Sequence, residues 1–333
     1  MTGTVLRLGT RASALATTQS RWVAQRLQEA TGRQVELVEV TTFGDTSRAH
    51  LSEIGGTGVF AAALRQAVLD GDVDLAVHSL KDLPTAPVDG LVVAAVPQRE
   101  DPRDVLVARD GLTLDTLPTG ARIGTGSPRR QAQLRALRPD FDVHPVRGNV
   151  DRRVAMVTDG GLDAVVLAHA GLLRLGRAHI VTSVLDPAVV LPAPGQGALA
   201  VECRSDDLEL VTAIALLDDA AARCAVTAER ALLAALEAGC TAPVGALATV
   251  SPEGLSLRAV AAATDGSVVL RRGLSGSVDD PAALGRELAA LLLADGAARL
   301  VDRSSAPMTT NGSTPPAPST TSRPFQPSPE RAP

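Results

Sequence analysis

The stretch GDVDLAVHSLKD, residues 71–82, decides the fold class of this chain. A glycine and an aspartate precede an apolar run as long as a buried strand, and the run ends in the polar pair Lys81 and Asp82. A second stretch, GGLDAVVLAHAG (residues 160–171), has the same layout. Short apolar runs alternate with helical patterns around both stretches, so we predict α/β units with mainly parallel sheets. The likeness of the two stretches predicts two similar α/β domains.

Capping signals mark the helices of these units. Ser13 is placed to cap a helix that runs to about Ala30, and Ser127 followed by Pro128 starts another. Residues 96–104 read as a crossing between the domains, and residues 191–204, which proline and glycine interrupt, read as the return crossing.

From about Asp218 the pattern changes to a helix over Ala220–Ala238, two strands and a last helix at about 282–294. We therefore predict three domains and a tail. They are domain 1 at 1–98 plus about 198–216, domain 2 at 99–197, a smaller α+β domain 3 at 217–303 and a disordered Ser/Thr/Pro-rich tail at 304–333.

Composition narrows the class of protein. The 333 residues carry a formal net charge of -5, so no field for nucleic acid is expected. No 18-residue apolar span or apolar leader is present, and three cysteines form no disulfide framework, so we expect a cytoplasmic protein without a membrane partner. Metal and nucleotide chemistry have no support, because the HExxH, CxxC, Walker and GxGxxG patterns are missing.

Lys81 is the only lysine in the chain, whereas every other Lys+Arg position is arginine. With Asp82 it follows a predicted strand, and ligands of open α/β sheets bind at the carboxyl ends of strands. The pair is therefore a candidate for the active site. The alternative is an exposed ion pair of little energetic value.

Several arginines lie at predicted junctions between strands or loops and helices. Arg129 and Arg130 occupy the first turn of a helix, where the helix dipole disfavours cations, and this indicates an anion nearby. Because guanidinium groups bind carboxylates bidentately, the set predicts a ligand with many carboxylates. The alternative, that each is a solvated surface arginine, stays open. The other members of the set are Arg11, Arg147, Arg153 and Arg174.

Cys240 lies in EAGCTAPVG, residues 237–245, between a predicted helix and a predicted strand. Gly239 and Pro243 place it in a loop where its thiol is available, although a lone cysteine is often a small buried hydrophobe. Cys203 and Cys224 lie in apolar surroundings and read as such hydrophobes.

The chain resembles the porphobilinogen deaminase (hydroxymethylbilane synthase) family. Eight motifs carry the resemblance in family order over about residues 4–250: LRLGTRAS (6–13), GDVDLAVHSLKDLP (71–84), REDPRD (99–104), IGTGSPRRQ (123–131), RGNVDRR (147–153), AGLLRLG (170–176), LPAPGQGALAVECR (191–204) and AGCTAPVG (238–245). The resemblance implies that the first two domains are like type II periplasmic binding proteins. It also implies a transferase of porphyrin and haem biosynthesis that joins four porphobilinogen molecules into linear hydroxymethylbilane and releases ammonia.

The resemblance further implies a dipyrromethane cofactor joined through a thioether to Cys240, with Asp82 as the main catalytic residue beside Lys81. Ser13 and Ser127 are implied to lie close to the acetate and propionate groups of the cofactor and growing chain. The arginines implied to bind these groups are Arg129 and Arg130 for the cofactor and Arg11, Arg147, Arg153 and Arg174 for the substrate chain. We expect a monomer that acts on porphobilinogen. The chain departs from the family at Thr57, where many relatives carry lysine, at Pro128, where leucine is commoner, and in its tail.

Two other readings remain. A non-catalytic binding protein of the periplasmic-binding type would explain the duplicated layout and the arginines, but not Cys240 or the Lys81–Asp82 pair. An ordinary thiol-nucleophile enzyme lacks a histidine partner near Cys240.

Overall fold

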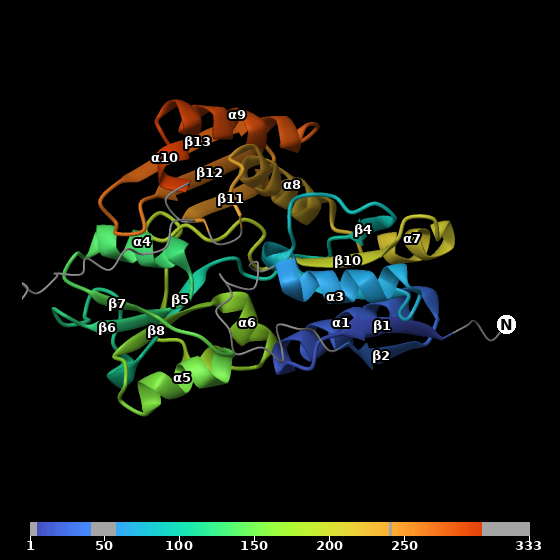
Figure 1. Ribbon diagram of the computed structural model, residues 1–333, viewed down its shortest axis with the longest axis horizontal. Coiled ribbons are helices and arrows are strands. Elements are labelled where there is room, and N and C mark those ends of the chain that lie inside the picture. The colour runs from blue at the N-terminus through green and yellow to red at the C-terminus, as the bar shows by residue number, and fades with distance from the viewer. Residues whose placement is uncertain (1–4, 41–57, 240–241, 302–333) are drawn as a thin grey trace, which may run out of the picture.

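The computed structural model describes residues 5–40, 58–239 and 242–301 of the chain (Figure 1). Thr57, Cys240 and the predicted tail at 304–333 lie outside the described residues. Three β-sheets with covering helices make up the described part, which confirms the α/β class.

The first sheet has the strand order β2-β1-β3-β10-β4. Strands β1, β2 and β3 run parallel, whereas β10 is antiparallel to both β3 and β4. The strands are β1 (Leu6–Thr10), β2 (Val35–Glu39), β3 (Leu75–Ser79), β4 (Leu91–Ala95) and β10 (Leu199–Arg204). Its helical elements are α1 (Ala14–Thr31), α3 (Gly58–Leu69), the short 3-10 helix η1 (Leu80–Asp82) and α7 (Leu208–Ala215).

The second sheet repeats this plan in the order β7-β6-β8-β5-β9, with β5 antiparallel to its two neighbours. Its strands are β5 (Asp104–Ala108), β6 (Arg122–Thr125), β7 (Asp142–Pro145), β8 (Ala164–Ala168) and β9 (Ser183–Val184). The helical elements are η2 (Arg109–Gly111), α4 (Pro128–Leu137), α5 (Val150–Thr158), α6 (His169–Arg174) and η3 (Ala178–Ile180). The two stretches that suggested a repeat form β3 and β8, which take the same place in their sheets, so the predicted duplication is confirmed.

Buried apolar strands explain why these sheets form. All five residues of β5 are buried, as are the first four of β3 and of β8. Strands covered by helices on both faces need such continuous apolar runs. The runs place the polar residues that follow them at the carboxyl ends of β3 and β8.

The third sheet is antiparallel, in the order β11-β12-β13, and confirms the predicted smaller α+β region. It comprises β11 (Val244–Ser251), β12 (Gly254–Ala262), β13 (Val269–Gly276), α8 (Ala220–Ala235), α9 (Pro281–Ala294) and α10 (Ala298–Val301). Helix α8 ends three residues earlier than the predicted Ala238, since Glu237 has the left-handed φ of 50°. Helices α8 and α9 approach closely, because a Cβ at Gly285 would lie 2.3 Å from the Ala228 carbonyl oxygen.

Two crossings connect the first and second sheets, and they touch each other. The Glu100 N–H donates to the Gly197 carbonyl at 3.2 Å. Gly197 has φ +88°, and a Cβ there would lie 2.3 Å from the Glu100 carbonyl oxygen, so only glycine allows this approach. Helix α1 lies next to α6 (Figure 1), since a Cβ at Gly171 would lie 3.7 Å from Leu15 Cδ2.

Glu229 of α8 fastens the third region to both crossings. Its side chain is fully buried and binds the Arg99 guanidinium through two contacts of 2.7 and 3.0 Å. It also accepts the N–H of Gly195 at 2.6 Å and that of Ala248 in β11 at 2.8 Å. A buried carboxylate that accepts four hydrogen bonds is well compensated, so these contacts fix α8 against the crossings.

Candidate active site

The Lys81–Asp82 pair lies on a turn that two buried leucines anchor. Leu80 and Leu83 are each 2% exposed, and the Leu83 N–H donates to the Leu80 carbonyl at 3.1 Å. The Leu80 N–H donates to the Ala198 carbonyl of the return crossing at 3.0 Å. With its apolar residues held inside, the turn presents Asp82 to solvent and leaves Lys81 half-buried.

Lys81 faces the second sheet. Its Nζ lies 3.4 Å from Oε1 of Gln196, a long hydrogen bond. Burial lowers the pKa of Lys81 to about 8; Arg130 and Arg129 lower it further, while the Asp82 and Asp104 carboxylates oppose the fall. With a pKa of about 8, the chain's only lysine gains or loses its charge when the charges around it change.

Arg129 and Arg130 share one buried carboxylate, that of Asp104 at the start of β5. Asp104 Oδ2 lies 2.8 Å from Arg129, and Oδ1 lies 2.7 Å from Arg130. The pKa of Asp104 is held well below its usual range because the two guanidinium groups outweigh the effect of burial. The anion expected beside these first-turn cations is thus, in the first place, a side chain of the chain itself.

Ser127 caps helix α4, and its Oγ accepts the Arg130 N–H at 3.5 Å. The cap and Pro128 at the first helical turn confirm the predicted helix start. Arg129 is 2% exposed and also donates to the Leu191 carbonyl, while Arg130 donates to the Val166 carbonyl at 3.0 Å. These contacts hold both guanidinium groups in fixed places between the second sheet and the return crossing.

Gln196 connects the two sheets. Its Nε2 donates to Asp104 and to the Pro102 carbonyl, both at 2.7 Å, and its Oε1 faces Lys81 and Arg130. The side chain is 1% exposed. Lys81 of the first sheet is therefore linked through one amide to the Asp104–Arg130 pair of the second.

Arg153 of α5 is a further cation near Arg130 and Asp82. Burial lowers the pKa of this half-buried arginine; nearby Arg130 lowers it too, while Asp82 raises it. A Cβ at Gly126 would lie 2.8 Å from the Val146 carbonyl oxygen and 3.4 Å from Arg153 Nη2, so the guanidinium lies beside the loop before α4. Arg153, Arg130 and Asp82 are thus close enough to act on one another electrostatically.

The remaining predicted residues lie around this centre. Arg174 at the end of α6 donates to the Gly197 carbonyl at 2.7 Å, and burial lowers its pKa while Glu100 raises it. Ser13 caps α1 as predicted, accepting the Ala16 N–H at 3.3 Å. Half-buried Arg11 follows β1, and exposed Arg147 lies between β7 and α5. Arg11 and Arg147 therefore lie where parallel strands end, as the sequence indicated.

The two cysteines in the described part do not form a reactive site. Cys203 is fully buried in the first sheet, and burial raises its pKa to about 11. Burial also raises the pKa of the half-buried Cys224 thiol. Because the thiolate is the reactive form, neither residue is suited to attachment chemistry. The position of Cys240 lies outside the described residues.

Three residues of the site were not identified from the sequence: Asp104, Gln196 and Glu229. Asp104 and Gln196 lie in the segments that read as crossings, and Glu229 lies within a predicted helix. The usable signal was a carboxylate or amide that interrupts an otherwise apolar or Gly/Pro-rich stretch. Such a residue is buried only when it has a partner, and the partner cannot be read locally.

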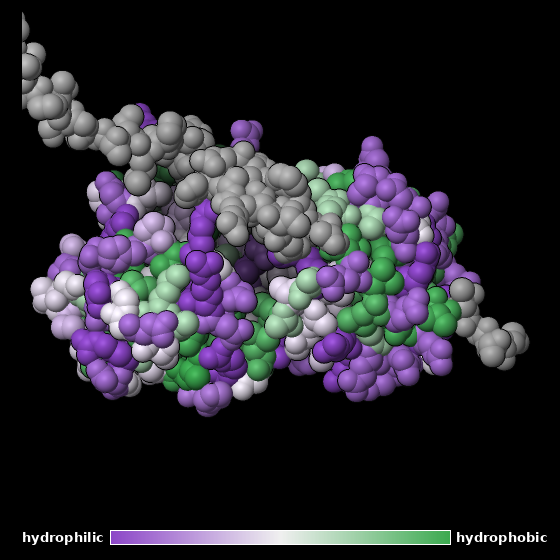
Figure 2. All heavy atoms as spheres, turned by 60° about the horizontal axis from the view of Figure 1, so that its bottom comes forward, coloured by the Kyte–Doolittle hydropathy of each residue, from purple (hydrophilic) through white to green (hydrophobic). Residues whose placement is uncertain are grey.

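The described residues fit a ligand with several carboxylates. Figure 2 shows one face of the molecule, which is hollowed in its middle, with hydrophilic residues at the hollow. Within the described part, the buried Nε atoms of Arg129, Arg130 and Arg153 have no hydrogen-bond partner. Buried N–H groups of cations without partners are costly unless an anion accepts from them. The described helices include none whose length and apolar character would let it span a membrane.

The chain is similar to known proteins over most of its length. Residues 6–212 match the family model described as porphobilinogen deaminase, dipyromethane cofactor binding domain, and residues 223–294 match the one described as porphobilinogen deaminase, C-terminal domain. Porphobilinogen deaminase 1 of Streptomyces coelicolor is 59% identical over 314 residues, which cover 90% of this chain and 98% of that protein. Porphobilinogen deaminase of Nocardia farcinica is 59% identical over 309 residues, covering 90% of this chain and 89% of that protein. Among solved structures, a periplasmic substrate-binding protein from Coxiella burnetii is similar with a TM-score of 0.40 at 16% identity, over 63% of this chain and 91% of that chain.

Proposed function

The chain belongs to the porphobilinogen deaminase family, and from this premise we propose which of its residues carry the reaction. Its function is that of a hydroxymethylbilane synthase, a transferase that joins four porphobilinogen molecules into linear hydroxymethylbilane and releases ammonia. The residue assignments below rest on the geometry of the described part.

The dipyrromethane cofactor is attached at Cys240 in this proposal. Cys240 lies within the residues that match the C-terminal domain model, and the other two cysteines have raised thiol pKa values. When bound, the cofactor supplies the pyrrole end to which the first substrate unit is joined. The residues that would hold the cofactor in place are Lys81, Asp82, Ser13, Ser127, Arg129 and Arg130. The buried Nε atoms of Arg129 and Arg130, which have no hydrogen-bond partner among the described residues, support this assignment.

Asp82 acts as the catalytic carboxylate. It is exposed on an anchored turn and lies within electrostatic reach of Lys81 and Arg153. An ionised Asp82 stabilises the cation that porphobilinogen becomes when ammonia leaves, and it accepts hydrogen bonds from pyrrole N–H groups. The exposure of Asp82 on this rigid turn, amid cations, is the observation that carries the proposal.

Carboxylate recognition falls to the arginines and Lys81. Arg11, Arg147, Arg153 and Arg174 bind the acetate and propionate groups of the substrate chain, since a guanidinium fork matches a carboxylate. Lys81 offers a compact charge with three donors beside Gln196, near the Asp104–Arg130 pair. Arg11 follows a strand of the first sheet and Arg147 a strand of the second, so one ligand can be held from both sides.

The wider organisation is also a proposal. We divide the chain into domain 1 (1–98 with about 198–216), domain 2 (99–197), domain 3 (217–303) and the tail, and the membership of strands in the three sheets supports this division. We further propose a cytoplasmic monomer that has no nucleic-acid partner, in line with the net charge of -5.

Turnover of Asp82→Asn tests the catalytic assignment. The variant keeps size and hydrogen bonding but removes the charge, so kcat should fall by at least about 100-fold. Its melting temperature should stay near that of the wild type because Asp82 is exposed. Asp89→Asn, in the loop that follows Asp82 and also exposed, is the matched control and should keep its kcat. A near-normal kcat for Asp82→Asn would remove Asp82 from the mechanism.

Intact mass tests the attachment. The purified enzyme should carry an added dipyrromethane unit that survives dithiothreitol, because a thioether is not reduced by thiols. The added mass should map to the peptide that contains Cys240 and disappear in Cys240→Ala, whereas Cys224→Ala should retain it. Active enzyme with the bare polypeptide mass would overturn the assignment of Cys240.

A further inference from the structure

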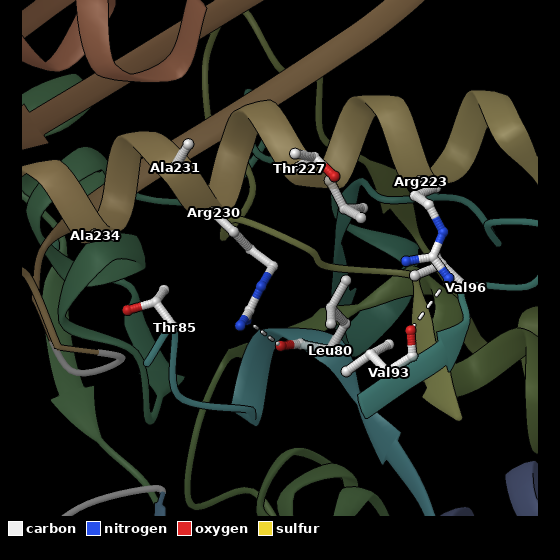
Figure 3. A pocket seen from close by; sticks show the side chains of 10 residues that line it. Leu80, Thr85, Val93, Val96, Arg223, Thr227, Arg230, Ala231 and Ala234 are labelled. Carbon is white, nitrogen blue, oxygen red and sulfur yellow. Dashed lines mark hydrogen bonds between the residues drawn. The ribbon is translucent and has the colours of Figure 1, made fainter. Parts of the chain in front are cut away.

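Helix α8 faces the back of the catalytic turn across a pocket of about 280 Å³. Two arginines of the helix, Arg223 and Arg230, line this pocket together with Leu80, Val93 and Thr227. Figure 3 shows Arg230 reaching from α8 toward the Leu80 carbonyl, and Arg223 reaching toward the Val93 carbonyl. An arginine of the third region therefore contacts the backbone of the catalytic turn.

Arg230 binds the carbonyls that flank the catalytic pair. Nη1 donates to the Leu83 carbonyl at 2.8 Å and, more weakly, to the Leu80 carbonyl at 3.5 Å. Nη2 donates to the Pro84 carbonyl at 2.8 Å. Leu80 precedes Lys81, and Leu83 follows Asp82, so one guanidinium donates hydrogen bonds to the backbone on both sides of the pair.

Arg223 is a contrasting neighbour on the same helix. It pairs with Asp218 at 2.7 Å and donates to the carbonyls of Val93 and Ala94 at 3.3 and 3.1 Å. These carbonyls belong to β4, not to the turn. Both arginines are half-buried and use their guanidinium groups on main-chain oxygens, but only Arg230 touches the segment that carries Asp82.

The helix that carries Arg230 is itself fixed. The preceding residue, Glu229, is fully buried and binds Arg99 and Gly195 of the two crossings. A supporting side chain positions a catalytic group precisely only when its own element is rigid. Arg230 therefore transmits the position of a fastened helix to the turn.

We propose that Arg230 is a positioning residue for the reaction: it holds the turn Leu80–Pro84 so that Asp82 and Lys81 face the site. The inference rests on the catalytic role proposed for Asp82. Charge-assisted hydrogen bonds to carbonyls are strong and directional. Without them the turn loses its restraint on the side of α8, and a displacement of about 1 Å at a catalytic group can cost about 100-fold in rate.

The test compares Arg230→Met with Arg223→Met. Methionine keeps the apolar stem and removes the guanidinium, so both variants lose contacts to main-chain carbonyls. For Arg230→Met we expect kcat to fall about 10- to 100-fold while the KM for porphobilinogen changes less. For Arg223→Met we expect kcat within about 3-fold of the wild type. Intact mass of each preparation verifies that cofactor-loaded enzyme is compared.

Hydrogen exchange supplies a readout that does not depend on turnover. The peptide that contains residues 80–84 should exchange faster in Arg230→Met and at the wild-type rate in Arg223→Met, because the carbonyl contacts restrain this turn. Arg230→Lys, which can still reach one carbonyl, should recover part of both kcat and protection. If Arg230→Met fails to fold, Arg230→Gln, whose amide is too short to reach the carbonyls, replaces it with the same expected results.

A double-mutant cycle separates this inference from the proposed function. In an Asp82→Asn background, Arg230→Met should lower kcat by less than about 3-fold, because its effect runs through Asp82. Full additivity, or equal kcat and exchange for Arg230→Met and Arg223→Met, overturns the positioning role. Normal turnover of Asp82→Asn alone would instead overturn the catalytic assignment.

Discussion

Replacing Asp104 by asparagine should destabilise the protein strongly. Asp104 is fully buried, and its two oxygens lie 2.7 and 2.8 Å from Arg130 and Arg129, which are themselves buried. The amide of Asp104→Asn keeps one acceptor but carries no charge. The two buried guanidinium groups would therefore lose the negative charge that they share. Breaking one buried ion pair costs about 3–5 kcal/mol, and we expect the free energy of unfolding to fall by at least that amount.

Asp163→Asn is the matched control. Asp163 also has two arginine partners in the second sheet, Arg109 at 2.9 Å and Arg122 at 3.4 Å, but both arginines are more than 40% exposed. Exposed pairs contribute about 0–1 kcal/mol, so this variant should lose about 1 kcal/mol or less. Urea unfolding followed by circular dichroism measures both variants under identical conditions.

The pH dependence gives an independent reading of the same carboxylate. A carboxyl group whose pKa is lower in the folded state contributes stability above its unfolded pKa, about 3.9, and loses it as the pH falls through the folded value. The pKa of Asp104 is lowered by Arg129 and Arg130. The stability difference between wild type and Asp104→Asn should therefore be constant from pH 8 to about 5 and narrow only below about 4. A loss within 1 kcal/mol of that of Asp163→Asn would refute the shared-carboxylate account.

The pKa of Lys81, lowered to about 8 by burial, should be raised by a bound carboxylate, which favours the charged form. The KM for porphobilinogen should therefore rise above pH 8, by up to about tenfold per unit, and this rise should disappear in Lys81→Arg because guanidinium stays charged; the same pH profile in both enzymes would contradict the role of Lys81. Gly197→Ala should destabilise the contact between the crossings by at least about 2 kcal/mol, since its Cβ would lie 2.3 Å from the Glu100 carbonyl oxygen at φ +88°. Gly176→Ala, at φ +68° with nothing within 4 Å, should cost only the conformational strain of about 1–2 kcal/mol, and an equal loss in both variants would show that the close approach is unimportant.

The secondary structure near the site could be predicted because its signals are local. Ser13 and Ser127 cap α1 and α4 as expected, since a cap is a bond to an N–H three residues away. The apolar runs before Lys81 and before His169 form equivalent strands, because alternation of strand and helix patterns is written along the chain. The end of α8 was predicted three residues late, because the left-handed Glu237 has no distinctive sequence signal.

The prediction of mainly parallel sheets was wrong: in the first two sheets of the described part, four strand pairs are parallel and four are antiparallel. The antiparallel strands β5 and β10 enter the sheets from the crossings, and their buried apolar residues resemble those of any central strand. Pairing across a sheet depends on residues far apart in sequence. Register and direction therefore follow from the packed structure, whereas the existence of the strands follows from composition.

Many charged groups of the site could be identified from the sequence: one lysine beside an aspartate after a strand, and arginines near the junctions of strands, loops and helices. The buried carboxylates Asp104 and Glu229, and the partner that each charge faces, became evident only from the packed structure. Asp104 and Arg130 lie 26 positions apart in sequence, and Arg230 meets the Leu83 carbonyl from 147 positions away. The physical reason is that electrostatic energy depends on distance and burial in space. Helix caps and strand patterns depend on neighbours in the chain, but the charge on Lys81 and the place of Asp82 depend on how three sheets pack.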